Sequence, residues 1–364
     1  MDHENYIRRA LELAKSGSGK VSPNPKVGAV IVKDGRVLSE GVHKAFGQPH
    51  AEIEAIHNTS PEALKNACLY VNLEPCSHHG KTPPCTEAII GTGIRTVIYG
   101  MKDPNPLVSG RGIKRLRQAG IEVIGPVLKD ECLSLNEGFV KAVLYRIPWI
   151  TVKIAQTLDG KIALSDGHSK WITCQASRRL VHQWRAEHDA VLVGIQTVLQ
   201  DDPMLNVRMT QGRSPKRIVL DTHLRIPVNA RVVSESPVNT IILTSESADR
   251  DKKKTLKDFG VSVLETETDQ NRIQLASVWQ TLIEKGICSI LVEGGQQVFT
   301  YFFERKTIDR LCIFIAPKIF GCGKNAVDDF NSADFQRDLP FTDFEWTSVG
   351  DDMLFKGTRT CLQV

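Results

Sequence analysis

One histidine, one glutamate and two cysteines stand in a pattern that suits chemistry at a metal. His50 and Glu52 belong to a His-Ala-Glu triplet, and Cys76 follows a proline and precedes Cys85. One imidazole and two thiolates leave the fourth tetrahedral position of Zn²⁺ open, which is typical of catalytic zinc. Water bound there has a pKa of about 7. We therefore expect these three ligands to bind zinc and Glu52 to pass the water's proton to a departing amine.

The spacing of the two cysteines separates this pattern from its nearest relatives. The arrangement resembles the cytidine-deaminase superfamily, whose signature is H-x-E followed by P-C-x-x-C. Here eight residues stand between the cysteines, and they include His78 and His79. The insertion argues against a nucleic-acid or free-nucleoside substrate. If His78 or His79 were a fourth ligand, the site would be the closed structural zinc of a non-enzymatic binding module.

The second half of the chain carries a weaker pattern. Residues 289–299 read SILVEGGQQVF, which predicts a buried strand, a Gly-Gly turn and the start of a helix. Such a turn lets the backbone approach a phosphate, and the helix N-terminus favours an anion. Residues 321–326 superficially fit G-x-G-x-x-A, but they do not open a βαβ unit, so we predict a loop there.

The elements around the zinc pattern predict an α/β domain over residues 1–147. Apolar spacing and turn residues indicate a sheet covered by helices on both faces. We expect helices over 4–16, from about 49–50, over 113–118 and over 133–146, and strands over 28–32, 36–41, 68–73, 95–100 and 121–125, the first two joined by an Asp-Gly hairpin turn.

A fresh pattern begins after Pro148 and predicts a second α/β domain over residues 148–364. Residues 245–257 are charged and are expected to form a solvated loop that leads into a helix. We expect strands over 149–155, 190–194, 217–221, 239–244, 289–295 and 310–316, with helices over 175–187 and 273–285.

Length and composition agree with two ordinary globular domains. The chain has 364 residues, of which 41% are hydrophobic and 24% charged, with a net charge of +4. No basic, aromatic-rich patch indicates nucleic-acid binding. The nine cysteines, the charged N-terminal segment and the absence of a long apolar run predict a cytoplasmic protein without membrane spans or disulfides.

Longer motifs resemble the bifunctional riboflavin-biosynthesis deaminase–reductase family. They are SPNPKVGAVIV (22–32), GVHKAFGQPHAE (41–52), LEPCSHHGKTPPC (73–85), DPNPLVSGRG (103–112) and WITVKIAQTLDGKIA (149–163). The resemblance implies a cytidine-deaminase-like α/β/α domain followed by a dihydrofolate-reductase-like α/β domain. It implies zinc-dependent deamination of 2,5-diamino-6-ribosylamino-4(3H)-pyrimidinone 5′-phosphate, then NADPH-dependent reduction of the ribosyl chain, in a homodimer or tetramer. The alternative is a zinc deaminase of another pyrimidine or nucleobase with a vestigial second domain.

The same resemblance implies positions for both substrates and for NADPH. Beyond the zinc ligands and Glu52, the pyrimidine pocket of the deaminase corresponds to Asn24, His43 and Lys81. The cofactor side of the reductase corresponds to Ala155, Trp171, Thr197, Asp201, Thr222, Gly295, Gln296, Gln297, Val298, Phe299, Thr300 and Tyr301. The substrate side corresponds to Lys153, Ser169, Arg185, Leu205, Arg208 and Glu293.

Four of these residues have simpler readings that stay open. Asn24, between two prolines, suits a turn, and Trp171 suits a core position. Asp201, in Asp-Asp-Pro, suits a turn with a helix cap. Arg185 lies on a charged helix and suits a solvated surface. Glu293 ends an apolar strand, and we expect it to contact the substrate.

Overall fold

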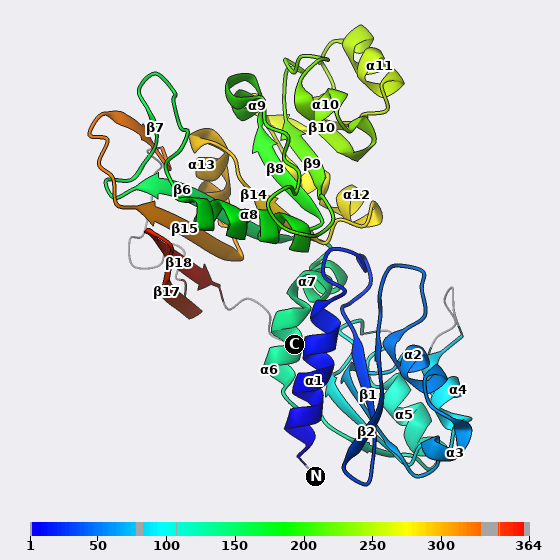
Figure 1. The fold of residues 1–364 in the computed structure, drawn as a ribbon. Helices are drawn as coiled ribbons and strands as arrows, with labels where there is room; N and C mark the ends of the chain where they lie inside the picture. The colour runs from blue at the N-terminus through cyan, green and yellow to red at the C-terminus, as the bar shows by residue number, and fades with distance from the viewer. Residues whose placement is uncertain (1, 78–82, 107, 329–340, 342, 360–364) are drawn as a thin grey trace. The chain divides into compact units, whose positions relative to one another are not determined.

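The chain folds into two compact units, residues 1–146 and 147–363. The structure is a computed structural model, and it describes residues 2–77, 83–106, 108–328, 341 and 343–359. Within these residues, none of the helices combines the length and apolar character needed to cross a bilayer. Figure 1 shows each unit as a sheet with helices packed on it.

The first unit is built on a five-stranded sheet of order β2-β1-β3-β4-β5. β1 is antiparallel to β2 and β3, whereas β3, β4 and β5 run parallel. Its elements are α1 (His3–Lys15), β1 (Gly28–Lys33), β2 (Arg36–Val42), α2 (Ala51–His57), α3 (Pro61–Leu64), β3 (Cys68–Leu73), α4 (Cys85–Ile90), β4 (Thr96–Met101), α5 (Arg111–Gln118), β5 (Glu122–Ile124), α6 (Lys129–Leu135) and α7 (Glu137–Tyr145).

Two glycines let helices approach the two faces of this sheet. A Cβ atom on Gly28 would lie 2.1 Å from the carbonyl oxygen of Ala10 in α1. A Cβ atom on Gly41 would lie 2.1 Å from the carbonyl oxygen of Ala51 in α2. No other residue fits at such contacts, so α1 and α2 sit directly on the strands. Figure 1 shows α1 and α6 on one face and α2, α4 and α5 on the other.

The single helix expected over 133–146 is two helices, α6 and α7, that meet at Asn136. This buried side chain accepts a hydrogen bond from the backbone nitrogen of Lys26 at 2.8 Å and donates to the carbonyl oxygen of Lys26 at 3.1 Å. Its backbone, at φ −111° and ψ 19°, departs from the helical conformation. The fold therefore breaks the helix where Asn136 binds the segment before β1.

The second unit is built on a nine-stranded sheet of order β11-β10-β9-β8-β14-β6-β15-β18-β17, which is parallel from β11 to β15. Its elements are β6 (Trp149–Thr157), β7 (Lys161–Leu164), α8 (Gln175–Glu187), β8 (Ala190–Gly194), α9 (Ile195–Asp201), β9 (Lys216–Leu220), α10 (Arg231–Ser234), η1 (Pro237–Asn239), β10 (Thr240–Ser245), α11 (Arg250–Asp258), β11 (Ser262–Thr266), β12 (Thr268–Asp269), β13 (Arg272–Ile273), η2 (Leu275–Ser277), α12 (Trp279–Glu284), β14 (Ser289–Val292), α13 (Gln296–Glu304), β15 (Arg310–Ala316), β16 (Gly323–Asn325), β17 (Asp343–Val349) and β18 (Asp352–Thr358).

The core of the second unit covers both faces of the parallel strands. Along β8, Ala190 and Leu192 belong to one hydrophobic cluster, while Val191 and Val193 belong to another. Because successive strand residues point to opposite faces, a fully apolar strand such as β8 must be covered on both sides. The strands that are continuously apolar in the sequence therefore form the buried centre of the nine-stranded sheet.

Four details of this unit differ from the sequence expectations. The loop expected over 321–326 contains the short strand β16, which pairs with β7. The charged segment 245–257 is largely helical, because α11 begins at Arg250 and Asp249 caps it by accepting from the backbone nitrogen of Lys252. The helix expected over 273–285 contains only α12 preceded by the 3-10 turn η2. The hairpin of β17 and β18 was not predicted at all.

Candidate active sites

The three expected zinc ligands lie together at one end of the first sheet. His50 is the residue before α2, Cys76 lies beyond the end of β3, and Cys85 begins α4. The Nδ1 atom of His50 is 3.2 Å from the sulfur of Cys85 and 3.6 Å from that of Cys76. All three ligand atoms lie within 4.8 Å of one another. One imidazole and two thiols fit the donor set of catalytic zinc.

Neighbouring donors prepare one of the two thiols for a metal. The backbone nitrogen of Cys85 is 3.3 Å from the Cys76 sulfur. A hydrogen bond from the Cys85 thiol, helped by His50, lowers the pKa of Cys76 to about 4, and burial opposes this shift. The Cys85 thiol, as the donor to Cys76, has a raised pKa. Cys76 is thus a thiolate near neutral pH, as metal binding requires.

Glu52 lies in the first turn of α2, two residues after His50, and its side chain is buried with 4% exposure. Burial, followed by the charge of Cys76, raises the pKa of Glu52 to about 7. A carboxyl group that titrates near neutral pH can both accept and return a proton. Glu52 therefore has the protonation behaviour that the proposed proton relay needs.

Asn24 and His43 form a polar chain that leads to the ligand His50. The Nδ1 atom of His43 is 3.0 Å from the carbonyl oxygen of Pro49, which can only accept a hydrogen bond. The Nε2 atom of His43 therefore accepts, from the Asn24 amide at 3.1 Å. The rings of His43 and His50 pack edge to face at 5.4 Å. Asn24 also takes part in a backbone turn with Val21, so the turn reading and the site reading both fit.

Glu74 is a residue near the zinc ligands that the sequence did not single out. Its buried carboxylate accepts hydrogen bonds from four backbone nitrogens, those of Asp103, Gly110, Gly112 and Ile113, at 2.9 to 3.3 Å. Glu74 therefore fastens segment 103–113 to the end of β3, two residues before Cys76. Lys81, His78 and His79 lie outside the described residues.

In the second unit, most expected residues gather at the carboxyl edge of the parallel strands. This edge is where ligands bind in open α/β sheets. Lys153 and Ala155 lie on β6, Ser169 and Trp171 precede α8, Arg185 lies on α8, Thr197 and Asp201 lie on α9, Leu205 and Arg208 follow α9, Thr222 follows β9, Glu293 follows β14, and residues 295–301 cap and form most of α13.

Two adjacent glycines shape the cofactor side of this edge. A Cβ atom on Gly294 would lie 2.5 Å from the Cβ atom of Val298, so the Gly-Gly turn passes tightly over α13. A Cβ atom on Gly295 would meet only the Thr197 hydroxyl, at 3.7 Å. The first backbone N–H groups of α13 are thus next to a hydroxyl donor. This arrangement fits the phosphates of a dinucleotide such as NADPH.

Trp171 is a surface residue and not a core residue. Its side chain is 60% exposed, and the guanidinium of Arg178 lies 4.4 Å from its ring centroid. The amino group of Lys318 donates to the carbonyl oxygens of Trp171 and Ile172 at 2.8 Å. An exposed indole held in this way offers a flat apolar surface to a ligand ring. Asp201 lies in the last turn of α9, 3.8 Å from the amino group of Lys170, and is not a free turn residue.

Arg185 forms a bidentate ion pair with Glu293 instead of facing solvent. The two nitrogen–oxygen distances are 2.6 and 2.8 Å, and the two side chains are only 11% and 8% exposed. The charges of Arg185 and Lys153 lower the pKa of Glu293, although burial opposes this. Burial lowers the pKa of Lys153, while Glu293 opposes that shift. The expected substrate side therefore holds two cations around one carboxylate.

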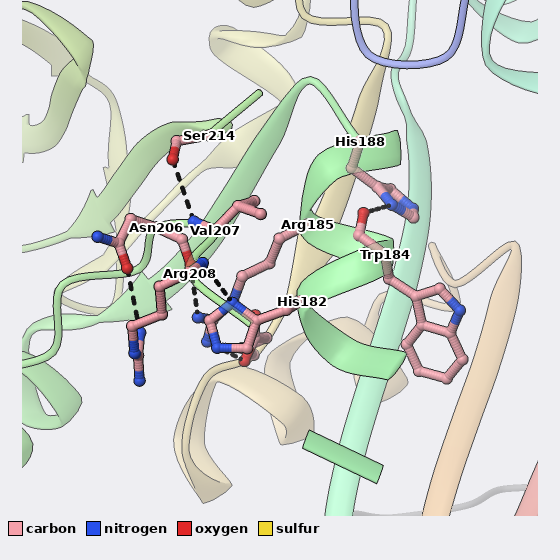
Figure 2. Close-up of polar contacts among 9 residues, drawn as sticks. His182, Trp184, Arg185, His188, Asn206, Val207, Arg208 and Ser214 are labelled. Atoms are coloured by element: carbon pink, nitrogen blue, oxygen red, sulfur yellow. Dashed lines mark hydrogen bonds and ion pairs between the residues drawn. The ribbon is translucent and has the colours of Figure 1, made fainter. Parts of the chain in front are cut away.

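His182 and Asn206 extend this cluster, and sequence reasoning missed both. Figure 2 shows His182 and Arg185 on α8 facing the segment that carries Asn206, Val207 and Arg208. The Nη1 atom of Arg185 donates to the carbonyl oxygen of Asn206 at 3.1 Å, and Arg208 donates to the Asn206 side chain at 3.1 Å. No sequence motif marks His182, because its partner lies on a loop 26 residues away.

Sequence models of two known families match the chain, one in each half. The cytidine and deoxycytidylate deaminase zinc-binding region matches residues 1–101, and the RibD C-terminal domain matches residues 148–355. With the site geometry, these matches define an enzyme with a zinc deaminase domain followed by a reductase domain. The predicted α/β fold class, with the deaminase-type domain first, is confirmed. The deaminase region binds zinc and the RibD C-terminal domain uses NADPH, so the predicted cofactors are confirmed as well.

Proteins named RibD are similar to this chain over nearly its whole length. The chain belongs to the RibD family of riboflavin-biosynthesis deaminase–reductases. A riboflavin biosynthesis protein RibD from Aquifex aeolicus is 42% identical over 352 residues, 96% of this chain and 97% of the relative. The structure of Acinetobacter baumannii RibD matches with a TM-score of 0.89, 35% identity and 99% coverage of both chains. A diaminohydroxyphosphoribosylaminopyrimidine deaminase/5-amino-6-(5-phosphoribosylamino)uracil reductase from Thermotoga maritima matches with a TM-score of 0.85, 41% identity and 98% coverage of both chains.

The family match decides between the functions left open by the sequence. A binding module without activity is excluded, since the family is enzymatic. A vestigial second half is not favoured, because the RibD C-terminal domain match runs to residue 355.

Proposed function

We propose that this chain deaminates 2,5-diamino-6-ribosylamino-4(3H)-pyrimidinone 5′-phosphate and then reduces the product's ribosyl chain. Water supplies the oxygen that replaces the amino group, which leaves as ammonia. The reduction adds a hydride to C1′ of the ribosylamino group and a proton to the ring oxygen whose bond to C1′ breaks, and it gives a ribitylamino chain. When bound, zinc supplies a water of lowered pKa and NADPH supplies the hydride. The observation that carries the proposal is the His50, Cys76 and Cys85 cluster with buried Glu52 beside it.

In this proposal residues 1–147 perform the deamination. Glu52 moves protons between water and the departing amine, since its pKa lies near 7. Asn24 and His43 orient the pyrimidine beside His50. The ordered Asn24–His43 hydrogen bond supports this, because it fixes the direction of each donor and acceptor.

Residues 148–364 perform the reduction. The N-terminus of α13 and Thr197 hold the cofactor phosphates, Trp171 covers a cofactor ring, and Ala155, Asp201 and Thr222 complete the cofactor side. On the substrate side, Arg185 and Arg208 attract the phosphate. The exposed guanidinium of Arg208 offers paired donors to its oxygens, whereas two donors of Arg185 are already paired with Glu293. Lys153, Ser169, Leu205 and Glu293 surround the rest of the substrate.

Mass spectrometry of the ribosylaminopyrimidinone phosphate, after incubation with zinc-loaded protein, tests both steps. Without NADPH we expect only the mass change for replacement of an amino group by oxygen. With NADPH we expect the further gain of two hydrogens. The first change alone would refute the reductase assignment, and no change in a folded, zinc-loaded protein would refute the substrate.

A pair of matched variants on α2 tests the deaminase residue. Glu52→Gln should lower deamination by roughly 10²–10⁴-fold and leave zinc content and reduction unchanged. Glu54→Gln is the control, since Glu54 binds Lys44 and the backbone nitrogen of Val42 and lies two residues further along. Equal activity of the two variants would remove Glu52 from the mechanism.

We also infer a cytoplasmic homo-oligomer, a dimer or a tetramer. Cys76 and Cys85 must stay reduced to bind zinc, which suits the cytoplasm. β17 is an edge strand of the large sheet, and Phe344, Trp346 and Met353 on the β17–β18 hairpin are exposed. Apolar side chains on an edge strand favour pairing with a second copy. Trp346→Glu should shift the sedimentation coefficient toward that of the monomer. If the variant keeps the oligomeric state of the wild type, this surface is not the interface.

A further inference from the structure

His182 has a single defined hydrogen-bonding state in this structure. It lies on α8, one turn before Arg185, and is 4% exposed. Its Nδ1 atom is 3.2 Å from the backbone nitrogen of Arg208. A backbone N–H can only donate, so Nδ1 must carry a lone pair, and the neutral ring keeps its proton on Nε2.

The surroundings of His182 keep the imidazole neutral. Burial, followed by the charges of Arg185 and Arg208, lowers the pKa of His182 to about 4, and Glu293 and a hydrogen bond with the backbone of Asn206 only partly offset this shift. Protonation would also place a proton on Nδ1, where it would face the N–H of Arg208. At neutral pH His182 therefore acts as a fixed hydrogen-bond acceptor.

The segment that His182 holds is the one that carries Arg208. Leu205 has a φ of +51°, so the chain turns sharply there, and its side chain is buried. Arg185 binds the carbonyl oxygen of Asn206, and Ser214 accepts from the backbone nitrogen of Val207 at 3.0 Å. His182 makes the last of these contacts and directly fixes the backbone of Arg208, whose own side chain is exposed.

We propose that His182 is a positioning residue of the reductase site, which fixes the backbone of Arg208 through Nδ1 so that Arg208 and Arg185 bind the substrate phosphate together. The proposal rests on the function proposed above for the two arginines. Figure 2 shows His182 between α8 and the Arg208 segment, where it can act on both. The alternative is a histidine that merely fills space in the core.

Two amide substitutions separate these possibilities, because they differ by one methylene. His182→Asn places an oxygen close to the position of Nδ1, so it should accept from Arg208 and keep the reductase KM within about threefold of wild type. His182→Gln places its oxygen near Nε2, and His182→Leu has no acceptor. Leaving the buried N–H of Arg208 without an acceptor should weaken phosphate binding by roughly tenfold or more. KM should therefore rise by about that factor in His182→Gln and in His182→Leu.

The measurement is steady-state reduction by the full-length, zinc-loaded protein with the phosphorylated substrate and with its dephosphorylated form. The variants should differ in KM only for the phosphorylated form, with kcat changed less than KM. Deaminase activity and the dissociation constant for NADPH should stay at wild-type values. Unfolding followed by tryptophan fluorescence reports on the second unit of each variant, since all five tryptophans lie there.

Three results would overturn the proposal. Equal KM values for the Asn and Gln variants would show that an acceptor at Nδ1 is not needed. Equal losses with the dephosphorylated substrate would show a general packing role. If Arg208→Ala leaves KM unchanged while the wild type reduces the substrate, Arg208 does not bind the phosphate. His182 then has no phosphate-binding residue to position. If His182→Leu unfolds the second unit, the comparison of His182→Asn with His182→Gln still tests the proposal.

Discussion

Arg185 and Glu293 are 108 residues apart in the chain and meet as a buried, two-pronged ion pair. Arg185 comes from α8, and Glu293 comes from the end of β14. Arg185 reaches on to the backbone of Asn206, so one guanidinium joins a helix, a strand end and a loop. The expected substrate side of the reductase is thus part of what holds the second unit together.

Arg185→Met should therefore destabilise the second unit as well as stop reduction. Removing one partner of a buried pair leaves the other charge unpaired, which costs about 3–5 kcal/mol. Tryptophan fluorescence in urea should show this loss. The control is Arg272→Met, because Arg272 binds Glu304 at the surface, and the expected cost there is about 1 kcal/mol or less. Similar losses in both variants would contradict the argument.

Lys153→Met should stop reduction without destabilising the fold. The pKa of Lys153 is lowered, mainly by burial, so the unfolded chain binds this proton more tightly than the folded one. Wild-type stability consequently rises as the pH rises from that lowered pKa toward the ordinary lysine value of about 10.4. The advantage of the Met variant should be largest at low pH and shrink across this window. A constant difference between pH 6 and pH 10 would refute the lowered pKa of Lys153.

Gly112→Ala should disturb the deaminase site from a distance. The new Cβ atom would lie 2.1 Å from the carbonyl oxygen of Pro75, next to Glu74 and one residue before Cys76. The backbone must move, so we expect weaker zinc binding and less deamination. Gly91→Ala is the matched control, since φ is −70° there and the nearest atom is 3.6 Å away. Zinc titration against a competing chelator measures the difference, and equal affinities would show that the contact can relax.

Trp171→Ala should weaken NADPH binding by roughly 3- to 10-fold, because a stacked ring contributes about 0.5–1.5 kcal/mol beyond its buried area. Trp171→Phe should keep most of the affinity. Trp346 is also exposed in the second unit but packs on Phe355 of β18 and is not among the expected cofactor residues, so Trp346→Ala should bind NADPH normally. Calorimetric titration with NADPH compares the three. Unchanged binding by Trp171→Ala would remove this residue from the cofactor side.

The zinc site was predictable because its chemistry is local. His50 and Glu52 share one turn, and Cys76 and Cys85 lie at the end of a strand and the start of a helix, so spacing and element type point to the same edge. Glu74 was not predictable. Its role depends on four backbone nitrogens in segment 103–113, and no residue type marks a backbone donor.

The second unit was predictable in its strands but less so in its contacts. The apolar runs of β6, β8, β10, β14 and β15 are continuous, as buried parallel strands require. The sequence did not predict the β17–β18 hairpin, because its strands lie at one end of the sheet, where polar and apolar residues mix. Gly350, with φ +61°, was its one local signal. The sequence did not single out His182, because its role depends on a hydrogen bond with the backbone of Arg208, which is distant in the sequence.

The order of strands in the large sheet also has a consequence for synthesis on the ribosome. β6 is made first in its unit, yet both of its neighbours, β14 and β15, are made near the end. The apolar residues of β6 therefore wait for their first partner until residues 289–292 have emerged and for their second until residues 310–316 have emerged, while the first unit can already fold. A nascent chain stalled before that point would carry a finished deaminase domain and an open, aggregation-prone strand, so slow translation should favour loss of the reductase half first.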